Sequence, residues 1–192
     1  MKVVAFNGSA RKNGNTSILL QAVLDKLDKE GIETEIISLA NKSIGGCTAC
    51  YQCFKNKDEK CGKDKGDAFI NEYVAKMKSA DGIILASPTY FADVSANMKA
   101  LIERCGMVVR ANNDLLQRKV GASVVAVRRA GASHVFSSLN YFFLIGQMII
   151  PGSSYWNIGI GKEPGDIASD EEGIRTMGDL GKNMAWLIKK LG

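Results

Sequence analysis

Residues 3–17 read Val-Val-Ala-Phe-Asn-Gly-Ser-Ala-Arg-Lys-Asn-Gly-Asn-Thr-Ser, and the class of fold follows from this segment. It starts with four apolar residues and continues into a polar loop that contains two glycines. In residues 16–30, which follow, Leu20, Val23, Leu24 and Leu27 have the spacing of one helix face. A short uninterrupted apolar run is typical of a parallel strand that is buried on both sides. We therefore predict a strand, a loop and a helix, in this order.

The same alternation continues along the chain. Further strands are predicted at 33–39, 82–86 and 120–127, with a fifth that starts at Met148. Helices are predicted at 67–79, around 98–105, at 133–147 and, after a capping box of Ser169 and Glu172, up to about Lys190. This pattern predicts one α/β domain, residues 1–192, with a doubly wound five-stranded parallel sheet and a cysteine-rich segment, 40–66, after the second strand. Ligands of such sheets bind beyond the carboxyl ends of the strands.

Composition excludes several classes of protein. Hydrophobic residues are 46% and charged residues 23% of the 192, which is ordinary for a globular chain and excludes a disordered, coiled-coil or collagen-like one. The apolar run at the N-terminus is too short for a signal peptide, and no segment is long enough to span a membrane. We expect a cytoplasmic protein with reduced thiols and no membrane partner. The charge of +5 is spread along the chain, so no nucleic-acid partner is expected.

The first loop has the composition of an anion site. A helix N-terminus offers unpaired backbone N–H groups, and short polar side chains and Arg11 add further donors. The spacing of Gly8 and Gly14 matches neither a P-loop nor the dinucleotide motif Gly-x-Gly-x-x-Gly, so a single phosphomonoester such as that of FMN fits better. The candidate phosphate ligands are Ser9, Arg11, Asn13, Asn15, Thr16 and Ser17. A strand–helix turn with a capping threonine is the alternative.

Two later loops can complete a site for a planar ring. Pro88, Thr89, Tyr90, Phe91 and Ala92 follow the third strand, where a stiff loop with two aromatic residues can hold a ring. Arg128 and Gly131 follow the fourth strand and are candidate cofactor contacts. Core or rim aromatic residues, and a solvated pair of arginines at Arg128 and Arg129, are the alternatives. Were the ring that of a flavin, no side chain would be required as a catalytic acid or base, because the cofactor carries the chemistry itself.

Four of the five cysteines form one compact run. Cys47, Cys50 and Cys53 are separated by two residues each, and Cys61 follows after seven more. Successive gaps of two are the compact iron–sulfur pattern, whereas structural zinc sites usually combine two separate pairs. An iron–sulfur cluster, an empty or redox-active thiol loop, and zinc are the possibilities. The fifth, Cys105, lies on an apolar helix face and is expected to pack as a small hydrophobic residue.

These motifs resemble those of a known family. The segments Gly8-Ser9-Ala10-Arg11 and Gly14-Asn15-Thr16-Ser17, with the Pro-x-Tyr at Pro88, are similar to the flavin loops of the flavodoxin-like NAD(P)H-dependent FMN reductases. The cysteine run after the second strand looks like that of the iron–sulfur flavoproteins within them. The resemblance implies FMN, one 4Fe–4S cluster and an oligomer, a dimer or tetramer. The pair Arg128-Arg129 departs from the family pattern, which is often glycine-rich there.

The resulting hypothesis is an FMN-dependent oxidoreductase or electron-transfer protein that couples FMN to one 4Fe–4S cluster. NAD(P)H, ferredoxin or a quinone as electron donor or acceptor is implied by the resemblance alone. A cluster-free NAD(P)H-dependent FMN or quinone reductase and a flavodoxin-type carrier without catalysis are the alternatives. The apolar residues 141–145 extend around more than one helix face, which favours a subunit interface.

Overall fold

The computed structural model describes residues 1–64 and 69–192. Its centre is a parallel sheet of five strands in the order β2-β1-β3-β4-β5. The strands are β1 (Lys2–Asn7), β2 (Glu33–Ser38), β3 (Gly82–Pro88), β4 (Val120–Val127) and β5 (Ile158–Ile160). This is the strand order of flavodoxin-like folds, and it confirms the predicted fold class. The order reverses at β1 and β3, so the loops after these two strands border the switch point.

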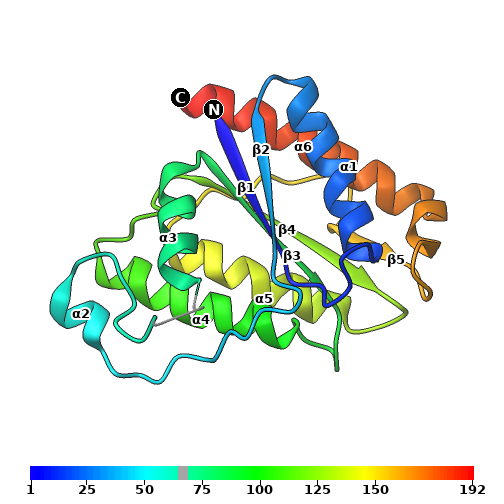
Figure 1. Ribbon diagram of the computed structural model, residues 1–192. Coiled ribbons are helices and arrows are strands. Elements are labelled where there is room, and N and C mark those ends of the chain that lie inside the picture. The colour runs from blue at the N-terminus through cyan, green and yellow to red at the C-terminus, as the bar shows by residue number, and fades with distance from the viewer. Residues whose placement is uncertain (65–68) are drawn as a thin grey trace.

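Helices cover both faces of the sheet (Figure 1). On one face lie α1 (Asn15–Lys29) and α6 (Glu171–Leu191), which pack against each other. On the other lie α3 (Ile70–Ser79), α4 (Ala96–Ala111) and α5 (Ala132–Ile145). The segment after β2 contains the short helix α2 (Gln52–Asn56), and a 3₁₀ turn, η1 (Asp166–Ser169), precedes α6. No helix in the described part of the chain combines the length and the apolar character that a membrane span requires.

The central strands are buried because they are apolar on both sides. All residues of β3 and β4 are buried, as expected for parallel strands between two helical layers. Successive side chains alternate between two cores: Val4 and Phe6 face α3, α4 and α5, whereas Val3 and Ala5 face α1 and α6. The sheet therefore holds the loops at its carboxyl edge on a rigid base.

The fifth strand does not start at Met148, as the sequence predicted. Ile149 makes only an isolated bridge to Val120, and Pro151 then interrupts the pairing because proline has no N–H to donate. The strand that pairs with β4 is Ile158–Ile160. It is three residues long and has a glycine at its centre, so it carries no apolar run that could reveal it.

Two helix starts also differ from the prediction. The N-cap of α6 is Asp170, whose carboxylate accepts a hydrogen bond from the N–H of Gly173, whereas the hydroxyl of Ser169 donates to the carbonyl of Asp166. The predicted capping box was therefore wrong by one residue. For the helix predicted at 67–79, the structure has Ile70–Ser79. The predicted start at 67–68 and the end of the 40–66 segment lie outside the described residues.

Candidate functional site

A cavity of about 190 Å³ opens at the carboxyl edge of the sheet, among the loops after β1, β3, β4 and β5. It is lined by Ser9, Arg11, Gly14, Asn15, Thr16, Pro88, Thr89, Tyr90, Ala126, Val127, Arg128, Gly161 and Lys162. Four loops that are distant in the sequence thus meet at the edge where the fold class predicts a ligand.

The N-terminus of α1 faces this cavity with free donors. The first N–H groups of any helix lack an intrahelical partner, and here the N-cap is Gly14, which has no side chain to accept from them. The preceding loop is held by its own polar groups. The N–H of Ser9 donates to Asn7 Oδ1 (3.0 Å), and Ser9 Oγ accepts from the N–H of Arg11 (3.1 Å). This arrangement is suited to binding an anion.

The charges around the cavity favour the same kind of ligand. Arg11, Arg128 and Lys162 line it, and no acidic side chain does so in the described part of the chain. Thr89 lines it as well, and the Oγ1 atom of this residue is buried without a hydrogen-bond partner. A buried unpaired hydroxyl is costly, so this atom fits a site in which a bound molecule supplies the partner.

The loop after β3 turns tightly at the rim of the cavity. Tyr90 and Asp93 exchange backbone hydrogen bonds (2.9 and 3.0 Å), and Phe91 and Ala92 between them have φ values of 47° and 61°. Gly131, whose φ is 88°, supports this turn from the loop after β4. A Cβ at that position would lie 2.9 Å from Ala92 Cα. The close approach explains why a glycine stands there.

A second cavity, of about 210 Å³, is surrounded by the cysteine run. All four cysteines of the run line it: Cys47, Cys50, Cys53 and Cys61. The fold therefore brings Cys61 next to the other three, although seven residues separate it from Cys53 in the sequence. Lys63 and Arg104 add positive charge, and the lining holds no acidic side chain among the described residues. Four soft sulfur donors around one positively charged space fit an iron–sulfur cluster. Cys105 is buried in the core and does not line this cavity, and burial raises the pKa of its thiol.

The cysteine segment has an unusual backbone. Ala49 and Tyr51, which flank Cys50, both have left-handed φ values, 50° and 53°. Such conformations cost free energy in residues other than glycine and persist where the surroundings impose them. The turn brings the N–H of Gln52 to the thiol of Cys50, which is the main reason why the pKa of that thiol is lowered. Desolvation raises the pKa of Cys53, which is the buried member of the run.

Helix α4 fixes both ends of the segment. Glu103 Oε2 accepts a hydrogen bond from the N–H of Cys47 (3.2 Å), and the guanidinium of Arg104 donates to Cys61 Sγ (3.3 Å). The four cysteines of the run line one cavity. Within residues 1–64 and 69–192, no three side chains of His, Cys, Asp or Glu are arranged to hold a single metal ion.

Comparison with known proteins gives the family. Residues 1–163 match the NADPH-dependent FMN reductase family. An iron–sulfur flavoprotein of Methanocaldococcus jannaschii is 41% identical over 196 residues, which covers 98% of each chain. The chain belongs to the iron–sulfur flavoproteins. A further member, from Methanosarcina thermophila, is 31% identical and covers 98% of this chain and 96% of its own.

Solved structures agree on the fold of this iron–sulfur flavoprotein family member. RosB with its bound intermediate 8-demethyl-8-formylriboflavin-5′-phosphate superposes with a TM-score of 0.74 at 18% identity, over all of this chain and 80% of that one. The NAD(P)H:quinone oxidoreductase of Methanothermobacter marburgensis gives 0.69 at 15% identity, over 96% of each chain. At these identities the likeness supports the flavodoxin-like fold alone.

The structure gathers eight of the thirteen predicted cofactor ligands around the first cavity. These are Ser9, Arg11, Asn15, Thr16, Pro88, Thr89, Tyr90 and Arg128. The other five do not line it; they are Asn13, Ser17, Phe91, Ala92 and Gly131. Arg128 is exposed and lines the cavity, whereas its neighbour Arg129 lines an adjacent one.

Two predicted phosphate ligands have side chains that bind the protein itself. Asn15 Nδ2 donates to the carbonyls of Gly161 (3.1 Å) and Glu163 (2.9 Å), and Asn15 Oδ1 accepts from the N–H of Gly165 (2.8 Å). The hydroxyl of Ser17 accepts from Asn7 Nδ2 and donates to the carbonyl of Lys12. Their side chains shape the loops, which leaves the backbone N–H of Asn15 as its possible donor to an anion.

Sequence reasoning missed the contribution of the loop after β5. Gly161 and Lys162 line the cavity, with Gly14, Ala126 and Val127 from the other loops. Gly161 and Lys162 were missed because the fifth strand was predicted to start ten residues too early. A signal was present in the sequence, since Lys162 lies in a short glycine-bearing segment before the acidic start of α6.

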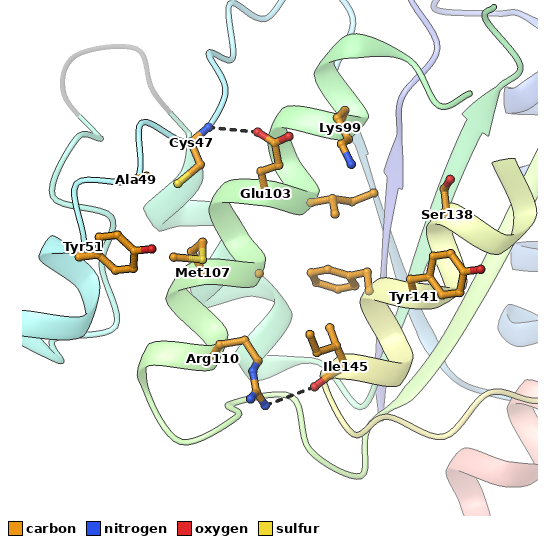
Figure 2. A pocket seen from close by; sticks show the side chains of 13 residues that line it. Cys47, Ala49, Tyr51, Lys99, Glu103, Met107, Arg110, Ser138, Tyr141 and Ile145 are labelled. Atoms are coloured by element: carbon orange, nitrogen blue, oxygen red, sulfur yellow. Dashed lines mark hydrogen bonds between the residues drawn. The ribbon is translucent and has the colours of Figure 1, made fainter. Parts of the chain in front are cut away.

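An apolar groove of about 620 Å³ lies beside the cysteine cavity, between α4 and α5 (Figure 2). It shares Cys47, Tyr51 and Met107 with that cavity. From the opposite side, Tyr141 and Ile145 project from α5, and both are more than half exposed. The cysteine cavity thus borders an open apolar surface between α4 and α5.

Proposed function

We propose that this protein is an FMN-dependent oxidoreductase that couples FMN to one 4Fe–4S cluster, within one domain spanning residues 1–192. The observation that carries the proposal is that four cysteines from a long polar segment line one cavity, in a chain whose sheet edge holds a separate cationic cavity. When bound, FMN would exchange electron pairs with a substrate, and the cluster would exchange single electrons.

We assign the phosphate of FMN to the N-terminus of α1. The free N–H groups of its first turn, the hydroxyl of Thr16 and the guanidinium of Arg11 would hold the phosphate. Ser9 keeps the loop in shape through its bond to Arg11. The absence of acidic residues from the lining, among those described, avoids repulsion of the phosphate.

We assign the ring of FMN to the loop that starts at Pro88. Tyr90 offers an aromatic face at the rim, and Thr89 Oγ1 is available as a partner for a polar atom of the ring. Arg128 would lie near the electron-rich side of the ligand. Phe91, which is fully exposed, would instead shield the ring from solvent or contact a neighbouring subunit.

We assign the cluster to Cys47, Cys50, Cys53 and Cys61. The positive charges of Lys63 and Arg104 offset part of the negative charge that four thiolates bring to the cavity. The five thiols are free of disulfides, which suits a reducing compartment such as the cytoplasm. NAD(P)H, ferredoxin or a quinone is proposed as the electron donor or acceptor.

We also propose a homo-oligomer that uses the groove between α4 and α5. One apolar surface on α5 is formed by the exposed residues Tyr141, Leu144 and Ile145. Single exposed apolar residues are normal, but a contiguous apolar patch is typical of an interaction site. A partner subunit on this surface would cover the outer side of Cys47 and protect the cluster from solvent.

The test compares two cysteine variants of the anaerobically purified protein. Cys50→Ser is expected to lose the broad iron–sulfur absorbance and retain that of FMN, because the two cavities have no side chain in common. Cys105→Ser, the matched control, is expected to keep both spectra. Oxidation of NAD(P)H with a quinone as acceptor tests the enzymatic part. A wild-type spectrum of FMN without any iron–sulfur contribution would favour the cluster-free reductase instead.

A further inference from the structure

A buried arginine contacts the last cysteine of the run. Arg104 Nη2 lies 3.3 Å from Cys61 Sγ and 3.2 Å from Asp64 Oδ1. The side chains of Arg104 and Asp64 are only 8% and 4% exposed. A guanidinium is seldom buried unless its charge is compensated, and here one carboxylate compensates it while the same nitrogen reaches a thiol.

The surrounding bonds hold the arginine in one position. Asp64 also accepts from the N–H groups of Ile70 (3.1 Å) and Asn71 (2.7 Å), so its carboxylate caps α3. Asn71 Oδ1 in turn accepts from the N–H of Cys61 (2.7 Å). Cys61 is therefore held at its backbone by α3 and at its sulfur by α4. This matters for Cys61 in particular, because the seven-residue gap before it is the longest in the run.

A hydrogen bond to a ligand sulfur alters the reduction potential of an iron–sulfur cluster. Net charge and hydrogen bonds to the sulfurs are among the factors that set this potential. Reduction adds one electron and thus one negative charge to the cluster. A fixed positive charge that also donates to a ligand sulfur stabilises the reduced form more than the oxidised form, and so raises the potential.

We propose that Arg104 is a positioning residue that holds the sulfur of Cys61 at the cluster and raises the reduction potential of the cluster. The inference rests on the proposed function, since it needs the cluster. Arg104 acts through Cys61. Asp64 holds the guanidinium of Arg104, and Asn71 holds the backbone of Cys61. Within residues 1–64 and 69–192, Cys61 is the cysteine of the run whose sulfur accepts a hydrogen bond from a charged side chain.

The test is a redox titration of the anaerobically purified holoprotein, followed by electron paramagnetic resonance. Arg104→Met removes the donor and the charge at similar side-chain volume and is expected to lower the cluster potential. Arg175→Met is the matched control, because Arg175 is exposed on α6, on the opposite face of the sheet, and its loss is expected to leave the potential unchanged. The rate of iron release to a chelator is measured alongside and should rise only in Arg104→Met.

A second variant allows for the cost of leaving Asp64 without its cation. Arg104→Lys keeps the charge but not the planar donor group, and its potential is expected to fall less than that of Arg104→Met. If the Arg104 variants and the control have the wild-type potential and release rate, the inference is overturned while the proposed function stands. If the wild-type protein holds no cluster, the proposed function itself fails, and the inference fails with it.

Discussion

At the scale of single residues, the most informative atom of the sheet-edge cavity is Thr89 Oγ1. It is buried and has no hydrogen-bond partner. Natural proteins rarely leave such a group without a partner unless a ligand, ion or water supplies one. Thr89 therefore links the geometry of the cavity to the chemistry of its ligand.

Replacement of Thr89 by valine should weaken FMN binding without destabilising the apoprotein. Valine has almost the same shape, and the loss of one hydrogen bond of about 1 kcal/mol corresponds to about a fivefold rise in Kd. Fluorescence titration with FMN and thermal unfolding measure the two effects. Ser123→Ala is the control, because Ser123 Oγ is also buried and unpaired but does not line the cavity. An unchanged Kd in Thr89→Val would remove the hydroxyl from the binding site.

Residue types alone could locate the anion loop but not the role of each side chain in it. A loop rich in Ser, Thr and Asn predicts many donors, and the structure does gather most of the predicted ligands around one cavity. The side-chain amide of Asn15, however, forms its hydrogen bonds with the loop at residues 161–165, which is 146 or more positions away in the sequence. Such long-range bonds depend on the strand order and leave no local signal.

At the scale of elements, the loops after β3 and β4 support each other. Gly131 touches the turn at Ala92, and both positions have left-handed backbones. The loops therefore form one unit at the edge of the sheet, and a change in one is transmitted to the other.

Gly131→Ala should disturb this unit. The new Cβ would lie 2.9 Å from Ala92 Cα, so the Pro88–Ala92 loop must shift, and FMN affinity should fall together with a stability loss of about 1–3 kcal/mol. Gly31→Ala provides the control, because Gly31 also has a positive φ (75°) but nothing lies within 4 Å of its would-be Cβ. It should lose only about 1 kcal/mol and bind FMN normally. Equal FMN affinity in both variants would refute the coupling of the loops.

An ion network at the edge of the sheet should make stability depend on pH. Glu35 on β2 lies 2.9 Å from Lys2 and is bonded to Lys76 of α3, and Lys76 is the main cause that lowers the pKa of Glu35. Because the folded-state pKa is lowered, the stabilisation is complete above the unfolded pKa of about 4.3 and is lost as pH falls through the folded value. Glu35→Gln should therefore cost about 0.5–1 kcal/mol at pH 7 and nothing in strong acid.

Urea unfolding at several pH values measures this difference. Glu33→Gln serves for comparison, because Glu33 pairs with Lys2 at 3.2 Å but is 69% exposed, and its effect should be close to zero. A cost for Glu35→Gln that does not change between pH 7 and strong acid would show that packing, and not charge, is responsible.

The elements also show where sequence patterns lose information. The strands β1, β3 and β4 carry apolar runs and were predicted, because parallel strands between two helical layers must be apolar. The edge strand β2 was predicted as well, although it contains two glutamates and is not buried. The fifth, Ile158–Ile160, is an edge strand of three residues, and Met148–Ile150 has the stronger local pattern. They differ in the extent of their pairing with β4, which is a single bridge for Ile149 and the whole strand for Ile158–Ile160. Pairing is a property of the whole sheet.

At the scale of the whole molecule, the proposed homo-oligomer rests on the exposed apolar face of α5. Ile145→Glu should place a charge in the proposed subunit interface and dissociate the oligomer. Trp186→Glu is the control, since Trp186 is 62% exposed on α6, on the other side of the sheet. Sedimentation velocity distinguishes the species. If dilute wild-type protein sediments as a monomer, the interface proposal is wrong.

The central claim is that one chain holds both FMN and an iron–sulfur cluster. Iron, acid-labile sulfide, zinc and FMN are therefore measured in the same anaerobically purified sample. The account predicts about four iron, about four sulfide and about one FMN per chain, with zinc near zero. FMN without iron and sulfide, or stoichiometric zinc in their place, would contradict it.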